Sequence, residues 1–127
     1  MNENKIEEYL IELMYTYHEI GTNMWLIEDP ENKLQEVVVM YSDPLIIVRT
    51  VVMLAPEENR LELFTKLLEL NASDVLHGAY ALDGNQIVLI NTMTYDTMDF
   101  TEFRDTLEAF SLALTQHYPI LSKFRTQ

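Results

Sequence analysis

Histidine is the residue type in this chain best suited to acid–base or metal chemistry, and only three are present: His18, His77 and His117. No two of them have the spacing that places two ligands on one helix face, and HExxH is absent. A zinc site needs three or four converging ligands, and the chain has no cysteine to supply one. His77 precedes an expected strand without an evident partner, which favours a structural role. We therefore expect no metal site and no cofactor.

Motifs for nucleophilic catalysis and phosphate binding are also missing. No serine lies in GxSxG or SxxK, and the three glycines are too far apart for a phosphate-binding loop. Glu57 and Glu58 are adjacent at an expected helix start, where the helix dipole stabilises negative charge. The stretch 83–85, Asp-Gly-Asn, lacks the EF-hand spacing and predicts a tight turn. We expect a protein that is not an enzyme and has no catalytic residues.

The expected helices and strands alternate in a simple order. Apolar residues at helical spacing predict a first helix over about 4–19, which ends near Gly21. Three strands are expected over 23–28, 35–41 and 45–54, and a second helix over 57–71 after Pro56. A hairpin over 78–82 and 86–93 precedes a third helix over 100–117, with Asp99 as its N-cap. This order predicts an α+β fold, α-β-β-β-α-β-β-α, in which a mostly antiparallel sheet packs against helices.

The amino-acid composition argues against several classes of binding partner. The 127 residues suit one domain over 1–127, and 48% of them are hydrophobic. The net charge is −13, with 8 basic against 21 acidic residues, which argues against nucleic acid and anionic membranes as partners. We find no signal peptide and no apolar run of about 18 residues. Together with the absence of cysteine, these features predict a cytoplasmic protein.

The expected second helix carries two apolar rows, although a surface helix normally needs one. One row is Leu61, Phe64 and Leu68, and the other, rotated by more than a quarter turn, is Leu63, Leu67 and Leu70. The second row must be buried by its own chain or by another molecule. We interpret Leu63, Leu67 and Leu70 as the seam of a homodimer, with burial inside the fold as the alternative.

A client-binding surface is expected on two elements. On the strand over 45–54, one face carries Leu45, Ile47, Val51 and Met53 together with Arg49, and the other face is also apolar. Apolar residues on both faces imply cover on both faces, by helices or by a partner. On the first helix, Ile11 and Tyr15 lie four residues apart, away from the main apolar stripe. We therefore interpret Ile11, Tyr15, Leu45, Ile47, Val51 and Met53 as candidate client-binding residues.

The stretch 67–110 resembles the C-terminal half of YbjN-like domains. Those domains have a leucine-rich helix that ends in Asn, a His-Gly or similar pair, two apolar strands around an acidic tight turn, and a final helix. The matching residues here are Leu67, Leu68, Asn71, Gly78, Leu82 and Asp83. The N-terminal half resembles the family in its order of elements.

This resemblance implies the fold of type III secretion chaperones, which are small, acidic, usually dimeric proteins that hold extended segments of client proteins. Many YbjN-like proteins are described as proposed regulators. We therefore predict a non-catalytic protein-binding domain, chaperone-like or regulatory, with a client or regulatory protein as partner and a homodimeric state. The acidic charge leaves an alternative, a small inhibitor or immunity-type protein that plugs a basic cleft on a toxin or enzyme.

Overall fold

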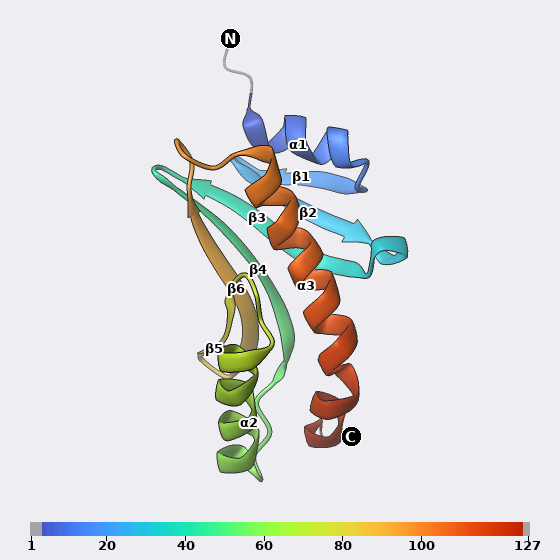
Figure 1. The fold of residues 1–127 in the computed structure, drawn as a ribbon, viewed down its shortest axis with the longest axis vertical. Helices are drawn as coiled ribbons and strands as arrows, with labels where there is room; N and C mark the ends of the chain where they lie inside the picture. Colours follow the sequence, from blue (N-terminus) through green and yellow to red (C-terminus); the bar gives the residue numbers. More distant parts are fainter. Residues whose placement is uncertain (1–3, 126–127) are drawn as a thin grey trace.

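A computed structural model describes residues 4–125, in which six antiparallel strands form one sheet and three helices pack on it (Figure 1). The elements are α1 (Lys5–Leu13), β1 (Tyr17–Gly21), β2 (Met24–Asp29), β3 (Leu34–Ser42), β4 (Leu45–Leu54), α2 (Arg60–Ser73), β5 (Ala79–Asp83), β6 (Gln86–Thr94) and α3 (Phe100–Leu121). Short 3-10 helices cover Pro30–Asn32 and Ser122–Phe124. The strand order is β1-β2-β3-β4-β6-β5, and the predicted α+β fold class is confirmed. None of the helices in the described part of the chain is long and apolar enough to cross a membrane.

The first helix is shorter than the sequence predicts. It ends at Leu13 because Met14 adopts a left-handed conformation with φ of 63°, and the Met14 N–H bonds carbonyls of the last turn. The chain then turns back as β1, which pairs with β2 from Tyr17 opposite Ile27 to Gly21 opposite Met24. The predicted helix over 4–19 is therefore wrong in its second half, and the sheet has one strand more than expected.

Most other elements lie close to their predicted positions, and β4 has the predicted bounds 45–54. The side chain of Asp99 caps α3 by accepting a hydrogen bond from the Glu102 N–H at 2.8 Å. Gly84 occupies the β5–β6 turn with φ of +60°, as the turn motif predicts. At Gly78, with φ of +101°, an added Cβ would lie 2.6 Å from the Ile90 carbonyl oxygen, so close packing explains this glycine.

One core lies between the three helices and one face of the sheet. Each helix supplies buried residues to it, and the strands supply alternate residues such as Trp25, Val39, Val48 and Leu89. In Figure 1, α1 and α3 lie over β1–β3, and α2 lies beside β5 and β6. The residues between these core positions point to the opposite face, which no helix of the described chain covers.

A β-bulge changes the direction of side chains near the end of β4. The register with β6 shifts between Val51 and Met53, so alternation is interrupted at Val52. Met53 consequently enters the core and is 7% exposed, whereas Leu54 is 63% exposed. The expectation that Met53 shares a face with Leu45 is wrong, because one extra residue moves the following side chains to the other face.

Candidate protein-binding surfaces

The uncovered side of the sheet is an apolar surface, called the open face below. Its residues come from four strands and are half-buried or exposed: Met24, Leu26, Val38, Met40, Leu45, Ile47, Val51 and Ile90. They form rows across the sheet, because residues paired across antiparallel strands share a face. Met24, Met40 and Ile47 make one such row. Soluble proteins seldom leave a contiguous apolar patch of this kind without a partner.

Polar groups also lie on the open face, where Thr92 is opposite Ile47, Thr94 is opposite Leu45 and His18 is opposite Leu26. Arg49 lies in the row between Val38 and Ile90 and forms an ion pair with Asp83 at 2.8 Å. Because both side chains are partly solvated, this pair contributes little to stability. It ties β4 to β5 across β6 and leaves the aliphatic side chains around it accessible.

Three of the six candidate client-binding residues lie on the open face, namely Leu45, Ile47 and Val51. Their shared face was predicted from alternation along β4. Alternation in β2 and β3, at Met24, Leu26, Val38 and Met40, carries the same signal. Whether a client binds these residues stays a prediction.

The other candidate residues lie elsewhere. Ile11 is 64% exposed on α1, but Tyr15 follows the end of that helix and is half-buried against the core. Tyr15 lines a shallow hollow with Leu112 of α3, and burial followed by the charges of Glu108 and Asp29 raises its pKa. Ile11 and Tyr15 therefore do not form one helix face, and both are on the helical side of the molecule.

The two leucine rows of α2 have opposite environments. Leu63, Leu67 and Leu70 are buried in the core of the same chain, so their assignment to a dimer seam is wrong. The exposed row contains Leu61 at 83% and Leu68 at 69% exposure. Leu68 and Leu82 line a small apolar hollow between α2 and β5, with Phe64 at its side.

The outer edge of β1 is open for backbone pairing. The Glu28 N–H donates to the Thr16 carbonyl at 3.0 Å, which makes these two residues a hydrogen-bonded pair. Hydrogen-bonded and non-hydrogen-bonded pairs alternate along an antiparallel ladder. The main-chain N–H and C=O groups of His18 therefore point toward β2, and those of Tyr17 and Glu19 point outward. No hydrogen bond to these outward groups comes from elsewhere in residues 4–125. Thus β1, a strand that the sequence did not predict, supplies an open outer edge of the sheet.

His117 is the centre of a buried polar cluster. Its Nε2 lies 3.3 Å from the Asp74 carboxylate and its Nδ1 lies 2.7 Å from the Tyr80 hydroxyl. Since a carboxylate only accepts, Nε2 donates to Asp74 and a neutral ring accepts from Tyr80. Burial and the Asp74 charge raise the pKa of Tyr80, which keeps its hydroxyl protonated. The cluster joins α3 to β5 and to the end of α2 through side-chain hydrogen bonds.

The other two histidines lie apart from this cluster. His18 pairs with Glu28 at 3.5 Å on the exposed β1–β2 hairpin, and His77 precedes β5. Within residues 4–125, no three His, Asp or Glu side chains come together in a way that could hold a metal ion. The absence of a metal or cofactor stays a prediction.

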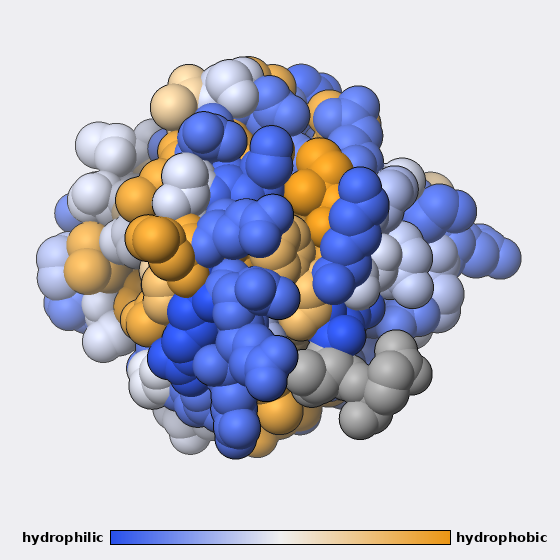
Figure 2. Space-filling view, turned by 90° about the horizontal axis from the view of Figure 1, so that it is seen from below, coloured by the Kyte–Doolittle hydropathy of each residue, from blue (hydrophilic) through white to orange (hydrophobic). Residues whose placement is uncertain are grey.

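Apolar and hydrophilic residues are interleaved on one end of the molecule (Figure 2). Seen from the end of the molecule where α3 finishes, hydrophobic residues form several separate patches, each bordered by hydrophilic residues (Figure 2). A hydrophilic rim around apolar patches fits a protein-binding surface.

Comparisons with known proteins agree with this geometry. The model of the CesT_Tir_1 family matches residues 1–127. No curated protein matches the chain in sequence. A chain of the heterodimeric ExoU–SpcU complex from the type III secretion system of Pseudomonas aeruginosa has the same fold, with a TM-score of 0.72 and 15% identity over 90% of this chain and 95% of that one. YbjN from E. coli has a TM-score of 0.65 and 14% identity, covering 90% of this chain and 89% of its own.

Proposed function

Because this chain belongs to the CesT_Tir_1 family of type III chaperones, we propose that it is a non-catalytic chaperone-like protein that holds an extended client segment on its open face. The observation that carries the proposal is the apolar sheet surface without a covering helix. Burial of one large aliphatic side chain contributes about 1.5–3 kcal/mol, so a few client side chains would suffice for binding. The proposed location is the cytoplasm.

The free edge of β1 would add backbone hydrogen bonds to this apolar contact. An extended segment can pair with the outward groups of Tyr17 and Glu19 as a further strand, while its alternate side chains contact the sheet. Main-chain pairing supplies affinity with little dependence on sequence. This combination suits a protein that keeps a client segment extended.

A photo-crosslinking side chain placed at Ile47 tests the proposal. Irradiation of cells that contain this variant and the native client, followed by mass spectrometry, should identify one cross-linked protein. The same group at exposed Glu57, away from the open face, should not capture it. A Met40→Glu/Ile47→Glu variant should remain folded and lose the client, because it places charge in an apolar contact. Undiminished capture by this folded variant would exclude the open face.

We also propose a homodimer, with its contact on the exposed row of α2. Leu61 and Leu68 replace the buried row as the candidate contact residues, and the adjoining hollow at Leu82 could accept apolar side chains of a second copy. A Leu61→Glu/Leu68→Glu variant should be a folded monomer by light scattering and circular dichroism. A wild-type chain that is monomeric at tens of micromolar would exclude the stable dimer.

The net charge of −13 favours a second candidate, an acidic inhibitor that fills a basic cleft. The two functions respond differently to salt. Apolar client capture should persist at about 1 M salt, where the screening length falls to roughly 3 Å, whereas binding of an acidic plug should weaken strongly. Cross-linking at Ile47 in low and high salt therefore separates them.

A further inference from the structure

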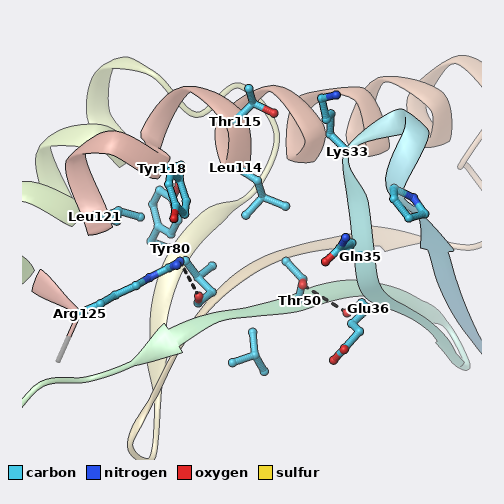
Figure 3. A pocket seen from close by; sticks show the side chains of 13 residues that line it. Lys33, Gln35, Glu36, Thr50, Tyr80, Leu114, Thr115, Tyr118, Leu121 and Arg125 are labelled. Atoms are coloured by element: carbon cyan, nitrogen blue, oxygen red, sulfur yellow. Dashed lines mark hydrogen bonds between the residues drawn. The ribbon is translucent and has the colours of Figure 1, made fainter. Parts of the chain in front are cut away.

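The strands β3 and β4 separate near one end of the sheet, and the space between them is called the fork below. Their pairing ends with Val38 opposite Arg49. Beyond this point, residues 34–37 of β3 pair with β2, and residues 50–54 of β4 pair with β6. The C-terminal half of α3 lies across the gap (Figure 3). The resulting pocket has a volume of ≈ 570 Å³, which is within the usual range for binding sites.

A β-bulge in each strand produces the fork. In β3, Glu36 has φ of 55°, and the register with β2 shifts between Ile27 and Asp29. In β4, the bulge lies at Val52. Bulges bend a strand and increase its twist, so the two strands diverge where the bulges lie. The Thr50 hydroxyl bonds the Glu36 carbonyl at 3.2 Å and marks the inner end of the fork.

Residues 50–54 of β4 have a free edge that faces the fork. The carbonyl oxygen of Val52 accepts a hydrogen bond from Arg125 Nη2 at 3.2 Å. A side chain thus takes the position in which a neighbouring strand would donate an N–H. Main-chain groups at a free edge can pair with an added strand.

Two basic side chains line this pocket in a strongly acidic protein. Lys33 follows the 3-10 helix Pro30–Asn32 and Arg125 follows the 3-10 helix Ser122–Phe124. Neither forms an ion pair with a carboxylate among residues 4–125. Figure 3 shows Arg125 beside β4 and Lys33 at the start of β3, on opposite sides of the pocket, with the Glu36 side chain directed away from Lys33. Leu114 and Tyr118 of α3 form the apolar wall between them. The lining combines a free strand edge, an apolar wall and two positive charges that no carboxylate among residues 4–125 pairs with, and Arg125 also lies 5.1 Å from the centre of the Tyr118 ring.

We propose that the fork binds an extended acidic segment of the client protein, which adds as a strand to residues 50–54 of β4. An N–H of the segment replaces Arg125 at the Val52 carbonyl, and the released guanidinium pairs with a carboxylate of the segment. Lys33 pairs with another carboxylate of the segment on the β3 side of the pocket. This inference rests on the proposed client-binding function and adds a second contact, at a different site from the open face.

A synthetic peptide of eight residues, alternating Thr and Glu and labelled with fluorescein, tests the charge requirement by fluorescence anisotropy with the full chain. A Lys33→Gln/Arg125→Gln variant should bind this peptide about tenfold more weakly, since two partly exposed charge pairs are lost. A Lys66→Gln/Lys123→Gln variant changes the net charge equally and should bind within about twofold of wild type. Equal loss in both variants, or equal binding of a Thr/Lys peptide, would overturn the proposal.

Amide hydrogen exchange tests the strand pairing. Peptide binding should slow exchange at residues 50–54 by about tenfold or more, because main-chain hydrogen bonds protect amides. Protection confined to β1 would overturn the fork proposal and leave the proposed function intact. A Met40→Glu/Ile47→Glu variant should still bind the peptide, so failure of the open face and failure of the fork give different results. Association of the chain with itself, abolished by Arg125→Gln, would assign the fork to a second copy and overturn the proposal.

Discussion

The two edges of the sheet end in different ways. At β5, the Asn71 side chain donates to the Tyr80 carbonyl at 3.1 Å and accepts from the Tyr80 N–H at 2.8 Å, so one amide bonds both outward groups of that residue. At β1, the outward groups of Tyr17 and Glu19 have no comparable partner in the described chain. An amide side chain therefore occupies at β5 the place of a further strand, and of these two outer edges β1 is the one that can accept a strand.

Removal of the Asn71 amide, which pairs with the outer edge of β5, should have the largest effect on stability. An Asn71→Leu variant keeps the side-chain volume but leaves the Tyr80 N–H and C=O unpaired beside an apolar hollow. We expect the free energy of unfolding, measured with urea, to fall by about 3 kcal/mol. Gln116→Leu, which changes an exposed amide on α3, should alter it by less than about 0.5 kcal/mol. Equal effects would mean that the β5 edge is not closed by Asn71.

Proline substitutions in β1 should distinguish its inner and outer groups. His18→Pro removes an N–H directed toward β2 and should lower the free energy of unfolding by about 2 kcal/mol. Glu19→Pro removes an outward N–H and should cost less than about 1 kcal/mol, while it weakens strand addition by a client. Chemical unfolding measures the first effect and client cross-linking the second. Equal destabilisation by both prolines would contradict the hydrogen-bonding pattern inferred for this edge.

The polar cluster around His117 should contribute less to the free energy of unfolding than Asn71 does. His117→Phe leaves the Tyr80 hydroxyl without its acceptor in a buried site and should lower the free energy of unfolding by about 1.5 kcal/mol. Adding Tyr80→Phe should recover part of this loss, because no unpaired hydroxyl remains. His18→Phe, on the exposed β1 hairpin, is the matched control and should have almost no effect. If the stability changes of the two single variants add up to that of the double variant, the two side chains do not interact.

Alkaline pH should produce the smallest of these effects. Burial, followed by the Asp74 charge, raises the pKa of Tyr80 above that of an unfolded tyrosine, near 10. The folded state therefore favours the protonated phenol, and the stabilisation is present below about pH 10 and lost as pH rises further. Between about pH 9 and 11, Tyr80→Phe should lose less stability than wild type, by about 1 kcal/mol. Tyr118→Phe, an exposed position, should follow the wild-type curve.

Sequence motifs that act over a few residues predicted several of the helices and strands correctly. The β-branched run of β4, the Asp-Gly-Asn turn after β5 and the Asp99 cap each act over a few residues, and the structure places them as expected. The hairpin of β1 and β2 had weaker signals. Thr16, Tyr17 and Ile20 favour a strand and Gly21 favours a turn, but Tyr17 also continues the helical spacing of α1. Nothing in the sequence identifies Met14 as the residue that ends the helix.

The surfaces were harder to predict, because they depend on packing between distant elements. Two leucine rows on α2 have similar composition, and only the position of α2 against β5 and α3 decides which row is buried. Met53 changes face through a bulge that has no glycine or proline to mark it. The fork requires two such bulges in neighbouring strands, so Lys33 and Arg125, 92 residues apart in sequence, gave no signal of sharing a pocket.

The strand order also has a consequence for folding kinetics. Four of the five neighbouring strand pairs in the described sheet are consecutive in sequence, and only β4 and β6 are separated, by α2 and β5. Hairpins form quickly, whereas pairing between distant segments requires closure of a long loop. We therefore expect β4–β6 closure to limit the folding rate. In stopped-flow refolding, Val48→Ala should slow folding, while Ile27→Ala in β2 should mainly accelerate unfolding.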